Sequence, residues 1–231
     1  MECARRVLEE RADLAAKLAH EIRGPVSTIR GIASTALAHD EALSDDERRE
    51  FLGLIRHEAE RMERTVEQIA LALRLDADAV RPQRRPRDLV ELVREASSVP
   101  DEADHDVTID APAELVASVD ATLVARAVRE GVENAIAFSP PGTPVVVRLA
   151  RDGEHAMIEV RDRGPGVPED RRESVFERLT DWRPPGYEDR SGTGLGLFIC
   201  RAVARLHGGD ASIAGNAEGG TMLTVRLPLD G

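Results

Sequence analysis

Apolar residues in the first third of the chain recur three and four positions apart, which is the spacing of one helix face. The series consists of Ala15, Leu18, Ile22, Pro25, Ile29, Ile32 and Ala36, followed by Ile55, Ala59, Met62, Val66, Ile69 and Leu73. Such spacing is typical of the seam of a coiled coil or helical bundle. Residues 39–46 interrupt it, and Ser44 followed by Glu47 has the spacing of a capping box that starts a new helix. The pattern therefore predicts an antiparallel helical hairpin within residues 1–78.

A single hairpin of this kind offers too little apolar cover to be stable alone. Two copies that pair through their apolar faces would form a four-helix bundle, which buries the seams of all the helices together. The pattern in residues 1–78 therefore predicts a homodimer.

The pattern changes after residue 78. The segment "VRPQRRPRD" contains two prolines and four arginines, and we expect residues 79–88 to be a linker. Beyond it, helical patterns at 89–97, 121–138 and 196–209 are interspersed with short strand patterns. These strands are expected at 107–109, 115–119, 145–150, 157–162, 211–215 and 222–229. Helices and mostly antiparallel strands in one block predict a two-layer α+β sandwich over residues 89–231.

Composition and charge narrow the classes of partner. The chain is 42% hydrophobic but only 3% aromatic, so we expect an aliphatic core. A formal net charge of -12 disfavours binding to nucleic acid or to an anionic membrane surface. Cys3 and Cys200 have no metal-site spacing, which argues against a zinc site or a disulfide framework. Neither a signal peptide nor an apolar run of about 20 residues is evident. We therefore expect a soluble, cytoplasmic chain, with any membrane-bound sensor region outside it.

Glu130 and Asn134 form the first candidate site. They lie four positions apart in the predicted helix 121–138, so their side chains share one face. A carboxylate and an amide oxygen placed in this way can hold Mg²⁺ together with phosphate oxygens. An isolated pair with this spacing more often belongs to a solvated helix face.

The motif "DRGPG" follows a predicted strand and begins at Asp162. A carboxylate there can accept a hydrogen bond from an exocyclic amine, which selects adenine because guanine offers a carbonyl at the equivalent edge. Gly164 and Gly166 let the backbone approach a flat base closely. Thr221, in the motif "GGT", either hydrogen-bonds near the base or simply favours a strand. The alternative for "DRGPG" is an ordinary Gly-Pro turn.

The motif "GTGLGL" opens the last predicted helix, and its first five residues are Gly192, Thr193, Gly194, Leu195 and Gly196. Backbone N–H groups at a helix N-terminus attract phosphate, and glycine leaves them accessible. No strand leads directly into the motif and its spacing is not G-x-G-x-x-G, so it is not a dinucleotide fingerprint. The polar segment before it, residues 177–191, is rich in proline and glycine. It is either a lid over a ligand or an ordinary flexible loop.

In their order, the motifs "ENA", "DRGPG", "VFERL", "GTGLGL" and "GGT" resemble the N, G1, F, G2 and G3 boxes of the histidine kinase ATP-binding domain. That domain shares a superfamily with type II DNA topoisomerases, Hsp90 and mismatch-repair ATPases. The resemblance covers residues 89–231. It implies an α/β sandwich that binds ATP under a flexible lid, with Asn134 on Mg²⁺, Asp162 on the adenine amine and residues 192–196 at the phosphates.

His20 is the candidate phosphoacceptor. It lies two positions from both Leu18 and Ile22, about 200° around the helix, and so points away from the seam. The Glu21 carboxylate can hold the proton of one ring nitrogen and leave the other as a nucleophile. Pro25 is expected to kink the helix nearby. The motif "HEIRGP" resembles the phosphoacceptor box of the same family, which implies that His20 is phosphorylated.

Three positions depart from the family pattern. Glu130 stands where close relatives usually carry Asn, and a Glu at that place activates water in the ATPase branches of the superfamily. Ala137 replaces a common basic residue, for which Arg190 is a candidate substitute. Gly24 lies one turn after His20, where relatives that dephosphorylate their partner often carry Thr or Asn. We therefore expect weak phosphatase activity.

The sequence predicts an ATP-dependent protein histidine kinase, with His20, Glu21 and Glu130 as catalytic residues and with Glu130 and Asn134 as Mg²⁺ ligands. The phosphoryl group would pass from ATP to His20 and then to an Asp of a response regulator receiver domain. One rival is a hydrolytic ATPase or conformational clamp that relies on Glu130. The other is a pseudokinase, a dimeric scaffold that has lost turnover.

Overall fold

The computed structural model describes residues 2–39, 42–98, 105–188 and 192–230, and the side chains of residues 2–18 and of His20 lie outside the described part. The chain divides into two compact units. Residues 1–71 and 191–193 form the first, and residues 72–190 and 194–231 form the second.

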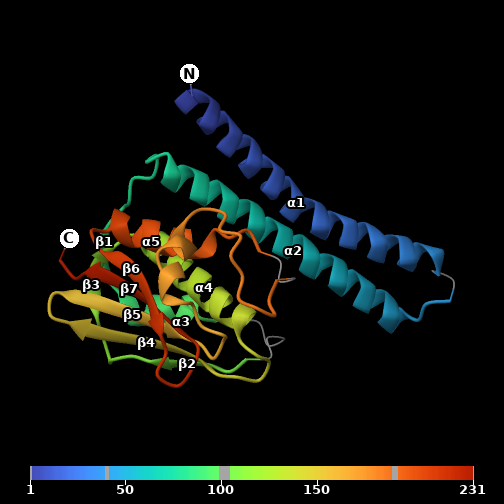
Figure 1. Ribbon diagram of the computed structural model, residues 1–231. Helices are drawn as coiled ribbons and strands as arrows, with labels where there is room; N and C mark the ends of the chain where they lie inside the picture. The colour runs from blue at the N-terminus through green and yellow to red at the C-terminus, as the bar shows by residue number, and fades with distance from the viewer. Residues whose placement is uncertain (1, 40–41, 99–104, 189–191, 231) are drawn as a thin grey trace. The chain divides into compact units, whose positions relative to one another are not determined.

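Helix α1 (Glu2–Ala38) and most of helix α2 (Asp45–Asp76) build the first unit, and the last turn of α2 belongs to the second. The two helices run in opposite directions on either side of the loop (Figure 1). The predicted capping box is confirmed, because Ser44 N donates to Glu47 Oε2 at 2.8 Å and Glu47 N donates to Ser44 Oγ at 3.3 Å. These hydrogen bonds with Ser44 lower the pKa of the Glu47 carboxyl. Pro25 lies inside α1, as expected. Among the described residues, no helix is both long and apolar enough to cross a bilayer.

The apolar residues of α2 separate into two rows. Ile55, Met62 and Ile69 are half-buried. Leu52, Val66 and Leu73 lie at heptad intervals on a neighbouring stripe and are 65%, 48% and 43% exposed. Val66 and Leu73 belong to the predicted seam, yet a single chain leaves each of them almost half exposed.

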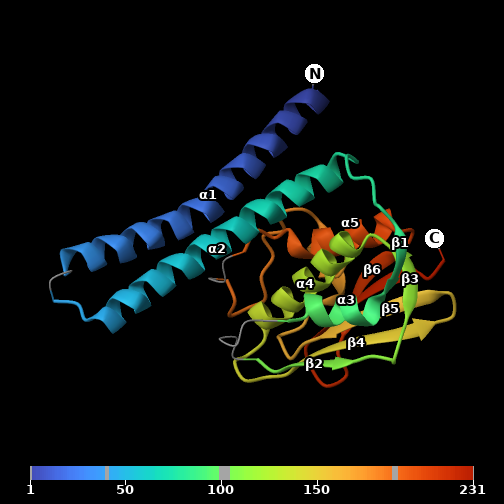
Figure 2. The ribbon, with the colours of Figure 1, turned by 180° about the vertical axis from the view of Figure 1, so that it is seen from behind.

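A five-stranded sheet forms one layer of the second unit. Its strand order is β2 (Val107–Asp110), β4 (Val145–Asp152), β5 (His155–Arg161), β7 (Thr221–Pro228) and β6 (Asp210–Gly215). Only the β2–β4 pair is parallel. Helices α3 (Leu89–Ala96), α4 (Ala121–Phe138) and α5 (Gly196–Leu206) cover one face of this sheet (Figures 1 and 2). The predicted two-layer α+β sandwich is confirmed.

The segment expected to be a linker over residues 79–88 ends in a strand. Strand β1 (Arg85–Asp88) pairs antiparallel with β3 (Val116–Val119) in a small second sheet. Before it, Gln83 N donates to Asp120 Oδ2 at 2.8 Å and an Arg84 Nη donates to the Leu206 carbonyl at 2.7 Å. Proline and arginine obscured this strand, because an exposed edge strand tolerates both and shows no apolar alternation.

The core of the second unit is aliphatic, as the composition predicts. Its largest fully buried side chains include Leu89, Ile158, Ile199 and Leu227. Phe176 is the one aromatic residue among the buried hydrophobic side chains of the described residues. Because few large rings fill this core, its shape depends on close helix–sheet packing of branched side chains.

His207 ties the end of α5 to the start of α4. Its Nε2 accepts from Asp120 N at 3.0 Å, so Nδ1 carries the proton and donates to the Val203 carbonyl at 2.8 Å. The ring is 2% exposed, and burial lowers its pKa. Asp120 in turn caps α4 by accepting from Leu123 N at 3.2 Å. A neutral His207 therefore joins two helices through their termini.

Candidate functional site

Asp162 lies at the end of β5 and joins two motifs that are far apart in the sequence. Its Oδ1 accepts from Gly164 N at 2.7 Å and from Thr221 N at 2.9 Å. The residue is 6% exposed, and burial raises the pKa of the carboxyl although these hydrogen bonds oppose the rise. Pairing of β5 with β7 brings Thr221 here, so "DRGPG" and "GGT" form one structure.

Glycine is required around Asp162 because the backbone packs tightly there. A Cβ at Gly220, where φ is +98°, would lie 2.2 Å from the Asp162 carbonyl oxygen. A Cβ at Gly164 would lie 2.6 Å from the Phe138 carbonyl oxygen. Gly166 also has a positive φ, +80°. Asn216 adds a hydrogen bond from Nδ2 to the Asp162 carbonyl at 3.1 Å. The result is a rigid cradle for one carboxylate.

Glu130 and Asn134 share a face of α4, as predicted, but they differ in environment. Asn134 is half-buried. Glu130 is 3% exposed, and Arg126 donates from Nε to its Oε1 at 2.8 Å. The charge of Glu130 also contributes to raising the pKa of the Cys200 thiol, although burial is the larger cause. Glu130 is therefore a paired carboxylate close to α5.

The residues on α4 fit Mg²⁺ only in part. No group of three or more His, Cys, Asp or Glu side chains able to hold a metal is present among the described residues. Mg²⁺ usually keeps several waters and takes one or two protein oxygens together with phosphate oxygens, so Asn134 suits it. The Arg126 bond makes Glu130 a poorer ligand than the sequence suggests.

One backbone hydrogen bond joins the chain at the two ends of the candidate lid. After the short helical turns η1 (Glu169–Arg171) and η2 (Ser174–Phe176), Leu179 N donates to the Gly194 carbonyl at 3.1 Å. Gly194 has a φ of +68°, and a Cβ there would lie 2.7 Å from the Thr180 carbonyl oxygen. The Tyr187 ring, in the candidate lid, lies 5.9 Å between centroids from the ring of Phe138 at the end of α4. Arg190, the candidate phosphate ligand, lies outside the described residues.

Helix α5 begins in the glycine-rich motif, as predicted. Leu195 precedes its first residue, Gly196, and provides no side-chain cap. The first N–H groups of such a helix favour an anion. Gly192 and Thr193 group with the first unit. The placement of these two residues beside a phosphate therefore stays a prediction.

The candidate phosphoacceptor region lies on α1. His20 is in this helix, but its side chain lies outside the described residues. Glu21 is half-buried, and Gly24 is exposed with no atom within 4 Å of the position that a Cβ would take. The orientation and roles of His20 and Glu21 stay predictions.

The sequence did not single out two residues that contact Glu130 and Asp162. Arg126 lies four positions before Glu130, a spacing that does predict an ion pair on a helix. Asn216 showed no signal beyond its place in a turn, because its contact with Asp162 depends on the pairing of β5 with β7.

Two family descriptions match the chain. Residues 119–231 match "Histidine kinase-, DNA gyrase B-, and HSP90-like ATPase". Residues 10–78 match "His Kinase A (phospho-acceptor) domain". The first match lies within residues 89–231 and the second within residues 1–78.

Individual proteins agree with these families. The sensor protein kinase PmrB of Pseudomonas aeruginosa is 33% identical over 99% of this chain and 48% of its own length. The probable sensor histidine kinase TcrY of Mycobacterium tuberculosis is 34% identical over 94% of this chain and 45% of its own. The chain thus spans about half the length of these relatives.

Solved structures extend the comparison. The mycobacterial sensor histidine kinase MprB is 32% identical with a TM-score of 0.55, covering 63% of this chain and 97% of that structure. The Acinetobacter baumannii histidine kinase AdeS, at 17% identity, a TM-score of 0.63 and coverage of 91% and 98%, shares the fold.

Proposed function

Because the chain belongs to the sensor histidine kinases of two-component systems, we propose that it transfers the γ-phosphoryl group of ATP to His20 and then to an Asp of a response regulator. The cradle around Asp162 is the observation that carries the nucleotide half of this proposal. The match of residues 10–78 to the phosphoacceptor domain supports the histidine half. Because the proposed phosphoryl donor, ATP, is available in the cytoplasm, the proposal includes a cytoplasmic location for this region of the protein.

Asp162 supports adenine as the base. Two backbone N–H groups hold its Oδ1, which fixes the plane of the carboxylate. A carboxylate has about four acceptor positions, so capacity remains for an exocyclic amine. Guanine would present a carbonyl oxygen at this edge and be repelled. The glycines beside Asp162 leave the backbone free of side chains where the base would lie.

Asn134 and the start of α5 suit the phosphate end of the nucleotide. Mg²⁺, when bound, neutralises charge on the phosphate oxygens. Asn134 would supply an oxygen ligand from α4. The N–H groups at Gly196 and in the following turn would face a phosphate with the positive end of the helix dipole. These residues orient the donor, and orientation is the main task of a phosphotransferase.

The chemistry at His20 needs one neutral ring nitrogen. That nitrogen attacks the γ-phosphorus, a P–N bond forms and the bond to the leaving β-phosphate oxygen breaks, which releases ADP. Glu21 would hold the proton of the other ring nitrogen and stabilise the charge that develops on the ring. In the second step an Asp carboxylate oxygen of the response regulator attacks the phosphorus and the P–N bond breaks.

The exposed row on α2 supports a homodimer. Leu52, Val66 and Leu73 form an apolar stripe at heptad spacing that one chain leaves open. A second copy offers the same stripe, and pairing the two stripes is how a four-helix bundle buries such residues. The response regulator would then dock on this bundle near His20.

The decisive experiment uses γ-labelled ATP with the wild type and with His20→Gln. We expect the wild type to gain an acid-labile, base-stable label and His20→Gln to gain none. His39→Gln is the matched control, because His39 is an exposed histidine that directly follows α1, the helix that carries His20. A label that persists in His20→Gln would overturn the assignment of the phosphoacceptor.

The rival hydrolytic function depends on Glu130, and the Arg126 contact weighs against it. A general base must reach the proton of an attacking water, and Oε1 of Glu130 is already bonded. Steady phosphate release that survives His20→Gln and disappears in Glu130→Ala would support the rival. Absence of ATP binding in calorimetry would instead favour the pseudokinase scaffold.

A further inference from the structure

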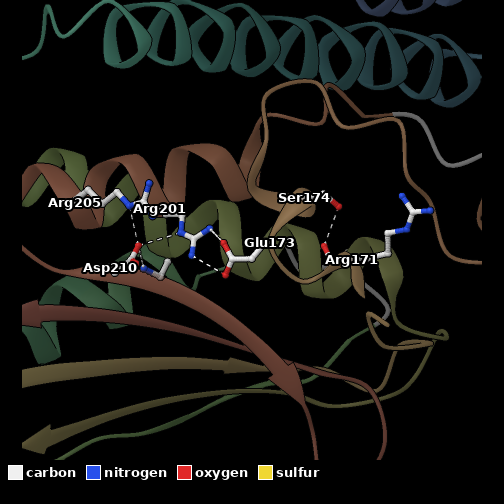
Figure 3. Close-up of polar contacts among 7 residues, drawn as sticks. Arg171, Glu173, Ser174, Arg201, Arg205 and Asp210 are labelled. Carbon is white, nitrogen blue, oxygen red and sulfur yellow. Dashed lines mark hydrogen bonds and ion pairs between the residues drawn. The ribbon is translucent and has the colours of Figure 1, made fainter. Parts of the chain in front are cut away.

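A network of four charged residues joins the segment before the lid to α5 and β6. The Arg201 guanidinium binds Glu173 through Nη1 and Nη2, at 2.7 and 3.2 Å from the two carboxylate oxygens. Its Nε donates to Asp210 Oδ1 at 3.0 Å, and Arg205 Nε donates to the same oxygen at 3.0 Å. Figure 3 shows Arg201 between the two carboxylates, with Asp210 on one side and Glu173 on the other. Every nitrogen of the Arg201 guanidinium is therefore bonded.

Arg201 differs from the partners of an ordinary surface ion pair. The Glu173 side chain is 83% exposed, and exposed pairs contribute little by themselves. Arg201, however, is only 12% exposed, and its guanidinium lies 4.3 Å from the centroid of the buried Phe176 ring. Hydrogen bonding to Arg201 also lowers the pKa of the Glu173 carboxyl. A two-pronged contact combined with ring stacking fixes the plane of the guanidinium, which a lysine cannot reproduce.

The network connects the two roots of the candidate lid, by which we mean residues 173–179 at its start and residues 194–201 after its end. Glu173 immediately precedes η2, and Phe176 ends it, directly before the candidate lid begins at residue 177. Arg201 lies on α5, which begins at Gly196, shortly after the end of the candidate lid. The hydrogen bond between Leu179 N and the Gly194 carbonyl joins the same two roots. The roots are thus held together twice, once by backbone and once by Arg201.

We propose that Arg201 is a positioning residue for nucleotide binding, because it holds η2 against α5 and so fixes both roots of the lid before the ligand arrives. The inference rests on the proposed function, since the roots matter in this way only if ATP binds at this site. A ligand binds more weakly when part of its binding free energy must first order mobile segments of the protein. Loss of Arg201 should therefore weaken nucleotide binding more than it slows the chemical step.

The test compares Arg201→Gln, Arg201→Lys and Arg205→Gln in the full chain. Calorimetry measures the Kd of a non-hydrolysable ATP analogue, and labelled ATP measures KM and kcat of autophosphorylation. We expect Arg201→Gln to raise Kd and KM by about five-fold or more while kcat at saturating ATP changes by less than about two-fold. Arg201→Lys should recover part of the loss, because it keeps a cation over Phe176. Arg205→Gln shares Asp210 but not Glu173, and should bind like the wild type.

Glu173→Gln provides a second route to the same conclusion. Because the Glu173 side chain is exposed, we expect this variant to fold. Its Kd for the ATP analogue should rise, as in Arg201→Gln. An unchanged Kd in a folded Arg201→Gln protein overturns the proposal, as does an equal loss in Arg205→Gln. If Arg201→Gln does not fold, an unchanged Kd in Glu173→Gln overturns it. A wild type that binds no nucleotide would instead refute the proposed function, so the two failures are distinguishable.

Discussion

Arg126 and Glu130 lie one turn apart on α4, and Nε of Arg126 donates to Oε1 of Glu130 at 2.8 Å. Their side chains are 18% and 3% exposed, so the pair is largely shielded from water. Removing one partner of such a pair leaves a charge with little compensation. We therefore expect substitution of either residue alone to destabilise the fold.

We expect Arg126→Gln to lower the free energy of unfolding by about 2 to 3 kcal/mol, because Glu130 would lose the charged hydrogen bond from Arg126. The double variant with Glu130→Gln should recover most of that loss, because two amides can hydrogen-bond without a buried charge. Denaturant unfolding of the four proteins of this double-mutant cycle measures the coupling. Additive losses in the double variant would show that the two residues are not coupled.

Asp162→Asn should separate stability from nucleotide binding. The amide Oδ1 can still accept from Gly164 N and Thr221 N, but an N–H group would face the adenine amine. Burial raises the pKa of Asp162, so the charged carboxylate destabilises the fold at neutral pH, and the neutral amide removes that cost. We expect an unchanged or higher Tm and an ATP affinity lower by about 30-fold or more.

Calorimetry with ATP and thermal unfolding test both parts of this prediction. Asp170→Asn is the control, because that carboxylate is exposed on η1. Wild-type affinity in Asp162→Asn would remove the basis for adenine recognition.

The adjacent residues Gly219 and Gly220 provide a matched pair. Both have a positive φ, +90° and +98°, but only at Gly220 would a Cβ collide with Asp162. We expect Gly219→Ala to cost about 1 to 2 kcal/mol from backbone strain alone. Gly220→Ala should cost about 1 to 3 kcal/mol more, because the cradle must shift, and should also weaken ATP binding. Thermal unfolding and nucleotide titration of the two variants give the comparison, and equal effects would contradict it.

His207 predicts a loss of stability in acid. Burial lowers its pKa below the ordinary 6.5, so the unfolded chain takes up a proton at a higher pH than the folded chain does. The stabilising contribution of the neutral ring is complete above pH 6.5 and declines as the pH falls toward the folded pKa. The expected slope of the unfolding free energy approaches about 1.4 kcal/mol per pH unit.

His207→Gln should lack this component of the pH dependence. The exposed His39→Gln serves as the control and should keep the wild-type profile. Chemical unfolding between about pH 5.5 and pH 8 tests the difference. Parallel profiles for the wild type and His207→Gln would show that another group controls acid stability.

Val66→Glu should weaken dimerisation. Val66 is 48% exposed in a single chain and lies in the middle of the exposed apolar row of α2. A carboxylate placed in a bundle interface loses its hydration without a partner, so we expect the dimer Kd to rise by about ten-fold or more. Sedimentation of Val66→Glu and of the exposed control Glu63→Gln measures the shift. A Val66→Glu protein that remains a wild-type dimer would exclude this row from the interface.

Local patterns determined much of this protein. The apolar spacing and the Ser44–Glu47 capping box predicted both long helices, because a helix repeats its own face and begins where its N–H groups are capped. The mixture of helix and strand patterns predicted the sandwich, and the order of the glycine motifs carried the resemblance to the family. Both helices depend on residues close together in the chain, where spacing alone defines which side chains share a face.

Tertiary structure decided the contacts between distant residues. Asp162 meets Thr221, 59 positions away, only because β5 pairs with β7. Arg201 reaches Glu173, 28 positions away, only because α5 packs beside η2. Strand β1 forms because β3 supplies its hydrogen-bonding partners. The residues "RPRD" alone show no strand pattern. Periodicity reports the faces of single elements, whereas the partner of a face depends on how the whole chain packs.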